Sequence, residues 1–263
     1  MIDRPLRNLT VMLSASVPDE YVGKDRSLDL FSLLKGLISC ILDGGGGVIF
    51  GGHPSVVAYA HAAALKAGPD NDGVHIYQLR RVHKDPVHRS LVECMLKLEG
   101  HTDEEVKTLD LEDSKAFRSV NWFPELAEGV GAELEQMRRA MAERSQAAVF
   151  SGGRTTGFHG DKPGIQQEYE IFREVHASKA ESVYLAGILG GATLDLIKKN
   201  EADAREPNSL GPYALIEVRQ SDNPDLVCGL IIADLMKFAA RLRRDSKPLP
   251  STTPGPDSPS GGG

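Results

Sequence analysis

The segment AAVFSGGRTTGFHGDKPGIQQE, residues 147–168, decides the fold of this chain. Its first four residues form a short apolar run, which is typical of a strand buried on both faces. Two glycines then mark a tight turn, and helical spacing begins after Pro163, which predicts a strand over residues 147–150 and a helix over 164–180. A strand followed by a turn and a helix is half of a βαβ unit, so this segment indicates a parallel sheet.

The same unit recurs on both sides of that segment. Short apolar runs predict further strands at residues 9–13 (LTVML), 48–50, 74–78, 106–111 and 182–185. Amphipathic spacing predicts helices at residues 28–42, 53–66, 87–98, 124–144, 192–199 and 226–244. We therefore expect an α/β fold of Rossmann-like type, with a doubly wound, mostly parallel sheet and helices on both faces.

Composition divides the chain into one folded domain and a tail. Residues 1–246 have the apolar spacing of a single folded unit, and we find no internal linker or repeat. Residues 247–263 (KPLPSTTPGPDSPSGGG) consist mainly of Pro, Ser, Thr and Gly. Such a segment buries too little apolar surface to offset its loss of conformational entropy, so we predict a disordered tail.

Charge and cysteine content exclude several classes of protein. The net charge of −7 argues against a general nucleic-acid binder, which needs an excess of Lys and Arg. The three cysteines, Cys40, Cys94 and Cys228, form no C-x-x-C pair, and we expect Cys40 and Cys228 to be buried thiols. We also expect no secretory leader, no membrane span and a cytoplasmic location, because no apolar run approaches the ~20 residues that cross a bilayer.

Four of the expected strand ends carry small polar residues or glycines. They are SAS at 14–16, FGGHPS at 50–55, FSGGRTTG at 150–157 and LAGILGGA at 185–192. The ends of parallel strands meet at one edge of the sheet, where glycine lets backbone amides approach an anion and a following helix adds its dipole. The predicted ligand-binding residues are Ser14, Ser16, Gly51, Gly52, His53, Ser55, Gly152, Gly153, Thr155, Thr156, Gly164, Gly190 and Gly191.

Familiar cofactor and metal motifs do not occur in the chain. Neither G-x-G-x-x-G nor the Walker motif follows any strand, which disfavours a dinucleotide dehydrogenase and a P-loop NTPase. His159 and Asp161 show no metal-ligand spacing, and no Ser–His–Asp pattern accompanies the strand-end serines. We therefore expect a small phosphate-bearing ligand, with no metal and no cofactor.

Five stretches together resemble the SLOG superfamily. They are LSASVP at 13–18, VIFGGHPS at 48–55, SGGRTTG at 151–157, KPGIQQEYEIF at 162–172 and VYLAGILGGA at 183–192, within a resemblance that spans roughly residues 8–245. This superfamily joins the Lonely Guy phosphoribohydrolases, once labelled lysine decarboxylase-like, to ligand-sensing domains of bacterial defence proteins and ion channels. The resemblance implies a Rossmann-like nucleotide-binding domain.

The enzyme branch of the superfamily has a compact P-G-G-x-G-T-x-x-E segment. Gly152 and Gly153 resemble its start and Glu168 its end, but residues 157–163 interrupt the loop between them. Arg154 and Arg173 are the candidates for the arginine of that branch. The interruption favours the sensing branch, which binds nucleotide-derived signals such as variants of cyclic ADP-ribose. Hydrolysis of a nucleoside monophosphate, with Glu168 and Arg154 as catalytic residues, is the alternative.

Several roles stay open at this point. Glu168 could contact a ribose or act as a general base, or it could be a first-turn acid that complements the helix dipole. Ser14 and Ser16 could donate to a ligand or satisfy their own turn. The helices at 124–144 and 226–244 could serve a homo-oligomer, and an effector could be a separate protein.

Overall fold

The computed structural model describes residues 4–22, 24–51, 73–80, 93, 97, 102, 104, 119–158, 162–178, 181–201 and 207–245. The predicted helices at 53–66 and 87–98, the predicted strand at 106–111 and the predicted tail lie essentially outside these residues. Three predicted ligand-binding residues lie outside them as well, namely Gly52, His53 and Ser55.

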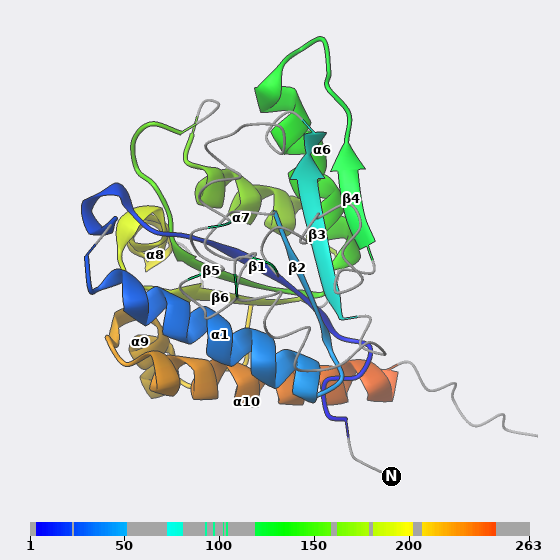
Figure 1. The fold of residues 1–263 in the computed structure, drawn as a ribbon. Coiled ribbons are helices and arrows are strands. Elements are labelled where there is room, and N and C mark those ends of the chain that lie inside the picture. Colours follow the sequence, from blue (N-terminus) through cyan, green and yellow to red (C-terminus); the bar gives the residue numbers. More distant parts are fainter. Residues whose placement is uncertain are drawn as a thin grey trace, which may run out of the picture.

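Among the described residues, a six-stranded parallel sheet forms the centre (Figure 1). Its strand order is β4-β3-β2-β1-β5-β6. The strands are β1 (Thr10–Ser16), β2 (Gly47–Phe50), β3 (Val74–Leu79), β4 (Ser119–Phe123), β5 (Ala147–Gly152) and β6 (Ser182–Ala186). Every neighbouring pair is parallel, as the short apolar runs predicted.

Helices cover both faces of this sheet. The described elements are η1 (Asp19–Tyr21), α1 (Ser27–Asp43), α6 (Val130–Arg144), α7 (Gly164–Val175), α8 (Gly191–Glu201), α9 (Pro212–Gln220) and α10 (Pro224–Asp245). Helices α1 and α10 lie together on one side of the sheet, and α6 and α7 lie on the other (Figure 1). The Rossmann-like, doubly wound α/β prediction is confirmed.

Two hydrophobic clusters, one on each face, hold these layers together. The first joins alternate β1 residues such as Leu13 to α1 and α10, where Leu34, Ile231 and Phe238 are almost completely buried. The second joins the other β1 residues, such as Met12, to α6, α7 and α8. Because side chains alternate along a strand, Ser14 shares a face with Met12. The side chain of Ser14 therefore points toward the α6 and α7 layer.

Differences from the predicted elements have local causes. Strand β4 was not predicted, since SVNWF is a short run that mixes polar and aromatic residues. Helix α9 was also missed; it begins at Pro212, the first-turn position that proline favours. Helix α6 begins at Val130 rather than at 124, because Gly129 (φ +92°) precedes it. The exposure of Cys40 contradicts its expected burial, whereas Cys228 is buried.

No helix among the described residues combines the length and apolarity that a membrane span requires.

Candidate functional site

The four strand ends predicted to form the site come together in the structure. Strands β2, β1, β5 and β6 are consecutive neighbours in the sheet, so their carboxyl ends share one edge. From β1 the chain continues to β2, β3 and β4 on one side of β1, and then to β5 and β6 on its other side. The strand order therefore reverses between β1 and β5. In open parallel sheets, ligands bind outside the carboxyl ends of the strands at such a reversal.

Glycines at this edge allow three backbones to touch. Gly152 has φ +69°, and a Cβ there would lie 2.3 Å from the carbonyl oxygen of Ser16. Gly191 has φ +61°, and its Cβ would lie 2.4 Å from the carbonyl oxygen of Gly153. The Gly153 amide donates to the Ser16 carbonyl at 2.8 Å, and the Ala192 amide donates to the Gly153 carbonyl at 3.1 Å. These glycines therefore join the ends of β1 and β5 to the start of α8.

The loops after β1 and β5 are tied together across the reversal. Arg154 donates from Nε to Asp19 Oδ1 at 2.7 Å, and the Thr156 hydroxyl donates to Asp19 Oδ2 at 2.9 Å. Arg154 and Thr156 were predicted as site residues, whereas Asp19 was not. The Asp19 carboxylate thus accepts hydrogen bonds from two loop groups, Arg154 and Thr156, that would also suit a phosphate, since both anions accept hydrogen bonds from arginine and threonine. We call this contact the Asp19 latch.

A buried ion pair lies beneath the start of α7. Arg138 on α6 donates from Nε to Glu168 Oε1 at 3.2 Å, with side-chain exposures of 8% and 14%. A second guanidinium nitrogen donates to Gln167 Oε1. A Cβ at Gly164 would lie 2.8 Å from Arg138 Nη2, so the guanidinium would have to shift if residue 164 carried a side chain. Glu168 belongs to the second turn of α7 and pairs with Arg138, which removes its interpretation as a first-turn dipole acid.

The serine hydroxyls at this edge differ in their partners. Ser14 is 3% exposed, and its Oγ has no hydrogen-bond partner among the described residues. The neighbouring Ser151 on β5 is equally buried but donates to the carbonyl oxygen of Ala186 at 3.0 Å. Thr193 in the first turn of α8 also buries a hydroxyl without a partner among the described residues. A buried hydroxyl without a partner costs free energy, so Ser14 and Thr193 are candidate ligand contacts.

Gly51 joins the site from the β2 side. A Cβ there would lie 3.3 Å from the terminal methyl of Met137, the residue before Arg138 on α6. The end of β2 is therefore close to the helix that carries the buried pair.

Gly190 lies in the turn where the sequence placed it, whereas Arg173 lies away from the site. Gly190 donates its amide to the carbonyl of Gly187 at 2.9 Å and forms the turn before α8. Arg173, one of the arginine candidates, pairs with Glu181 at 3.2 Å just before β6 begins, at the opposite edge of the sheet. Arg138 is the arginine that reaches Glu168, and sequence reasoning missed it because the two residues are 30 positions apart. Whether any predicted residue contacts a ligand stays a prediction.

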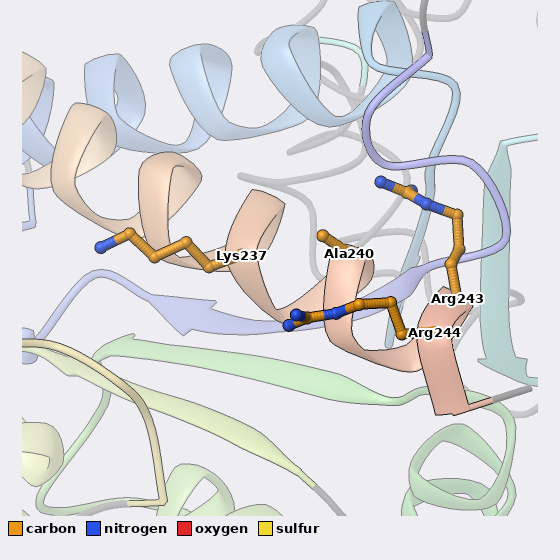
Figure 2. Close-up of a pocket in the computed structure, with 4 residues that line it drawn as sticks. All are labelled: Lys237, Ala240, Arg243 and Arg244. Carbon is orange, nitrogen blue, oxygen red and sulfur yellow. The ribbon is translucent and has the colours of Figure 1, made fainter.

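A shallow hollow elsewhere on the surface is separate from this site. Lys237, Ala240, Arg243 and Arg244 line it at the end of α10 (Figure 2). Arg243 donates to the carbonyl oxygen of Pro5, just before β1, which places the hollow near the opposite edge of the sheet. Within the described part of the chain, no group of three His, Cys, Asp or Glu residues could hold a metal ion.

The fold and the strand-end site define a Rossmann-like α/β protein. The chain belongs to the SLOG family, because the family model described as SLOG cluster2 matches residues 5–210. Membership suggests binding or processing of a nucleotide-related ligand. No curated protein matches the chain.

Proposed function

We propose that this protein binds and senses a nucleotide-derived small molecule, such as an ADP-ribose-like ligand, at the edge where β1 and β5 end. The observation that carries the proposal is the unpartnered, buried Ser14 hydroxyl at the reversal of strand order. Ligands favour that position in open parallel sheets. A ribose or phosphate oxygen there would give the hydroxyl the partner that it lacks.

In this proposal the two donors of the Asp19 latch, Arg154 and Thr156, bind the phosphate of the ligand. Arg154 and Thr156 now share the carboxylate of Asp19. A phosphate presents more acceptor oxygens than a carboxylate and pairs with arginine in a fork geometry. The phosphate would therefore replace Asp19, and the two loops would change position on binding. A cytoplasmic sensor could pass on this change through self-association or through a separate effector protein.

A thermal-shift screen tests the proposal. The panel consists of AMP, NAD, ADP-ribose, cyclic forms of ADP-ribose and cyclic nucleotides. A ligand that binds only the folded state adds about 2.7 kcal/mol of stability at roughly 100 times its Kd. We expect at least one member to raise the melting temperature, and the proposal fails if none does.

Two serine variants separate binding from folding. Ser14→Ala removes an unpartnered hydroxyl, so we expect unchanged or higher stability without ligand and weaker ligand binding. Ser151→Ala is the matched control on the adjacent strand, because it removes the donor of an existing hydrogen bond. It should lower stability by about 1 kcal/mol and leave affinity unchanged. The opposite pattern would assign Ser14 a purely structural role.

A second candidate function is hydrolysis of the N-glycosidic bond of a nucleoside monophosphate. The observation that favours it is the buried pair of Arg138 and Glu168 at the same edge. A carboxylate can serve as general acid or base, and an arginine can stabilise negative charge that develops in the transition state. Release of free base from AMP, measured by chromatography, tests this function. No turnover by the wild type, or full turnover by Glu168→Gln, would exclude it.

A further inference from the structure

Two of the three cysteines of the chain lie where α1 packs against α10. Cys40 belongs to α1 and Cys228 to α10, and the two helices lie side by side (Figure 1). Cys40 is exposed, whereas Cys228 is buried with an exposure of 7%. Neither residue belongs to the proposed ligand site. One thiol is therefore open to solutes, while the other is held inside the interface between the helices.

The side chain of Cys228 points at α1. A Cβ at Gly36 would lie 3.0 Å from Cys228 Sγ and 3.7 Å from Cys228 Cβ, so the sulfur is the closer of the two atoms. Gly36 and Cys40 are four residues apart on α1, which places them one above the other on the same face of that helix. Glycine at position 36 thus lets α10 approach the face of α1 that carries Cys40.

This approach is as close as a disulfide requires. Residues joined by a disulfide have Cβ atoms about 3.5–4.5 Å apart, and the Cβ of Cys228 already stands at such a distance from position 36. Cys40 lies one helical turn, about 6 Å, further along α1. The two thiols therefore need to bridge at most one turn of the helix.

The two thiols differ in the chemistry that they can perform. Burial raises the pKa of the Cys228 thiol to about 12, and the charge of the neighbouring Cys40 adds to the rise. Cys228 is therefore neutral at pH 7, and a neutral thiol reacts slowly with oxidants because the thiolate is the nucleophile. Exposure makes Cys40 the thiol that meets an oxidant from solution. Cys228 stands behind it as the second thiol of a pair.

We propose that Cys40 and Cys228 form a reversible disulfide that hydrogen peroxide drives and that joins α1 to α10. The Cys40 thiolate attacks one peroxide oxygen, the O–O bond breaks, and Cys40 becomes a sulfenic acid. The other oxygen leaves as hydroxide and becomes water with the proton that the Cys40 thiol released. The sulfur of Cys228 then attacks the sulfur of Cys40, the S–O bond breaks, and the proton of Cys228 leaves with the hydroxide as a second water. The two sulfurs together lose two electrons, which the peroxide gains, and a dithiol reductant reverses the change.

Peptide mapping of the full chain tests the proposal. The reduced protein is treated with hydrogen peroxide, its remaining thiols are alkylated, and disulfide-linked peptides are identified by mass spectrometry. We expect a peptide pair that joins Cys40 to Cys228 and that disappears on addition of dithiothreitol. Cys94→Ser should leave this pair unchanged, whereas Cys40→Ser should abolish it. Cys40→Ser changes an exposed side chain, so this variant should fold as the wild type does.

The unfolded chain is the matched control. Without a fold the shorter loop closes more readily, so in concentrated urea Cys40 should join Cys94 roughly sixfold more often than Cys228. The native protein should reverse this preference, because its fold holds Cys40 and Cys228 together. A native protein in which Cys40 joins mainly Cys94, or in which Cys40 is oxidised to a sulfinic acid without a partner, would overturn the proposal.

Thermal unfolding checks that the bond fits the native packing. A disulfide that closes a long loop restricts the unfolded chain, so the oxidised wild type should melt about 5–15 °C above the reduced protein. Oxidation should not raise the melting temperature of Cys40→Ser. An oxidised wild type that melts at or below the temperature of the reduced protein would also overturn the proposal.

Discussion

Removing Glu168 tests whether the Arg138–Glu168 pair is truly desolvated. The pair joins α6 to α7 at 3.2 Å with side-chain exposures of only 8% and 14%. Deleting one partner of a buried pair costs about 3–5 kcal/mol, since the remaining charge stays out of water. Glu168→Ala leaves Arg138 with Gln167, so we expect the low end, about 3 kcal/mol. In a protein of this size that corresponds to a fall in Tm of roughly 6–12 °C.

Urea unfolding provides the measurement. The single tryptophan, Trp122 on β4, reports the transition by fluorescence, and circular dichroism checks that unfolding is two-state. A double-mutant cycle with Arg138→Met and Glu168→Ala should give a coupling of about 1–3 kcal/mol that high salt barely changes.

The chain offers a matched control between the same two helices. Arg139 and Glu174 also form an ion pair at 3.2 Å, but their side chains are 37% and 65% exposed. The hydrogen bond to Glu174 raises the pKa of Arg139, yet water and salt screen this pair. A double-mutant cycle on Arg139 and Glu174 should therefore show no coupling energy at high salt. Equal couplings in the two cycles, or a loss below 1 kcal/mol for Glu168→Ala, would refute the reasoning.

Three further predictions follow from named contacts. Gly152→Ala should cost at least about 2 kcal/mol, because its φ is +69° and the new Cβ meets a carbonyl oxygen at 2.3 Å. Gly131→Ala is the control in the same unfolding assay: it has open space around it in helix α6 and should leave the stability unchanged or raise it slightly. Asp19→Asn should strengthen binding of the ligand found in the screen, measured by calorimetry, because it weakens the hold on Arg154 and Thr156, the phosphate-binding groups. Glu174→Gln, which removes a carboxylate from another ion pair, is the control and should leave the ligand affinity unchanged. Burial raises the pKa of the Cys228 thiol from 9.0 to about 12. The contribution of the neutral thiol to the free energy of unfolding is therefore complete below pH 9 and is lost as the pH rises toward 12. Cys228→Ala should flatten this decline of stability with pH, and an unchanged slope would contradict the burial of the thiol.

The sequence predicted the architecture because the decisive signals are local. A run such as residues 147–150 and a glycine pair after it are visible within a few positions, and they indicate a strand and its turn. The convergence of four strand ends followed from parallel topology alone, and the strand order β2-β1-β5-β6 confirms it. Strand β4 lacked such a signal, because its polar residues interrupt the apolar pattern.

The contacts within the site could not be predicted in the same way. Asp19 and Arg154 are 135 positions apart, and Arg138 reaches Glu168 across two helices, so no local pattern shows either contact. The glycines were expected to expose amides to an anion. In the structure the Gly153 amide is already used to join β5 to β1, so that glycine serves the close approach of backbones as well.

Hydrogen exchange of the full chain, with and without the tightest ligand of the screen, tests the central claim most directly. Exchange reports local opening, and a bound ligand slows it where the ligand makes contact. We predict slower exchange in the loops after β1 and β5, at residues 14–22 and 153–158, and at the start of α7. Protection confined to α10 or to the opposite edge of the sheet would contradict the claim that the ligand binds where the strand order reverses.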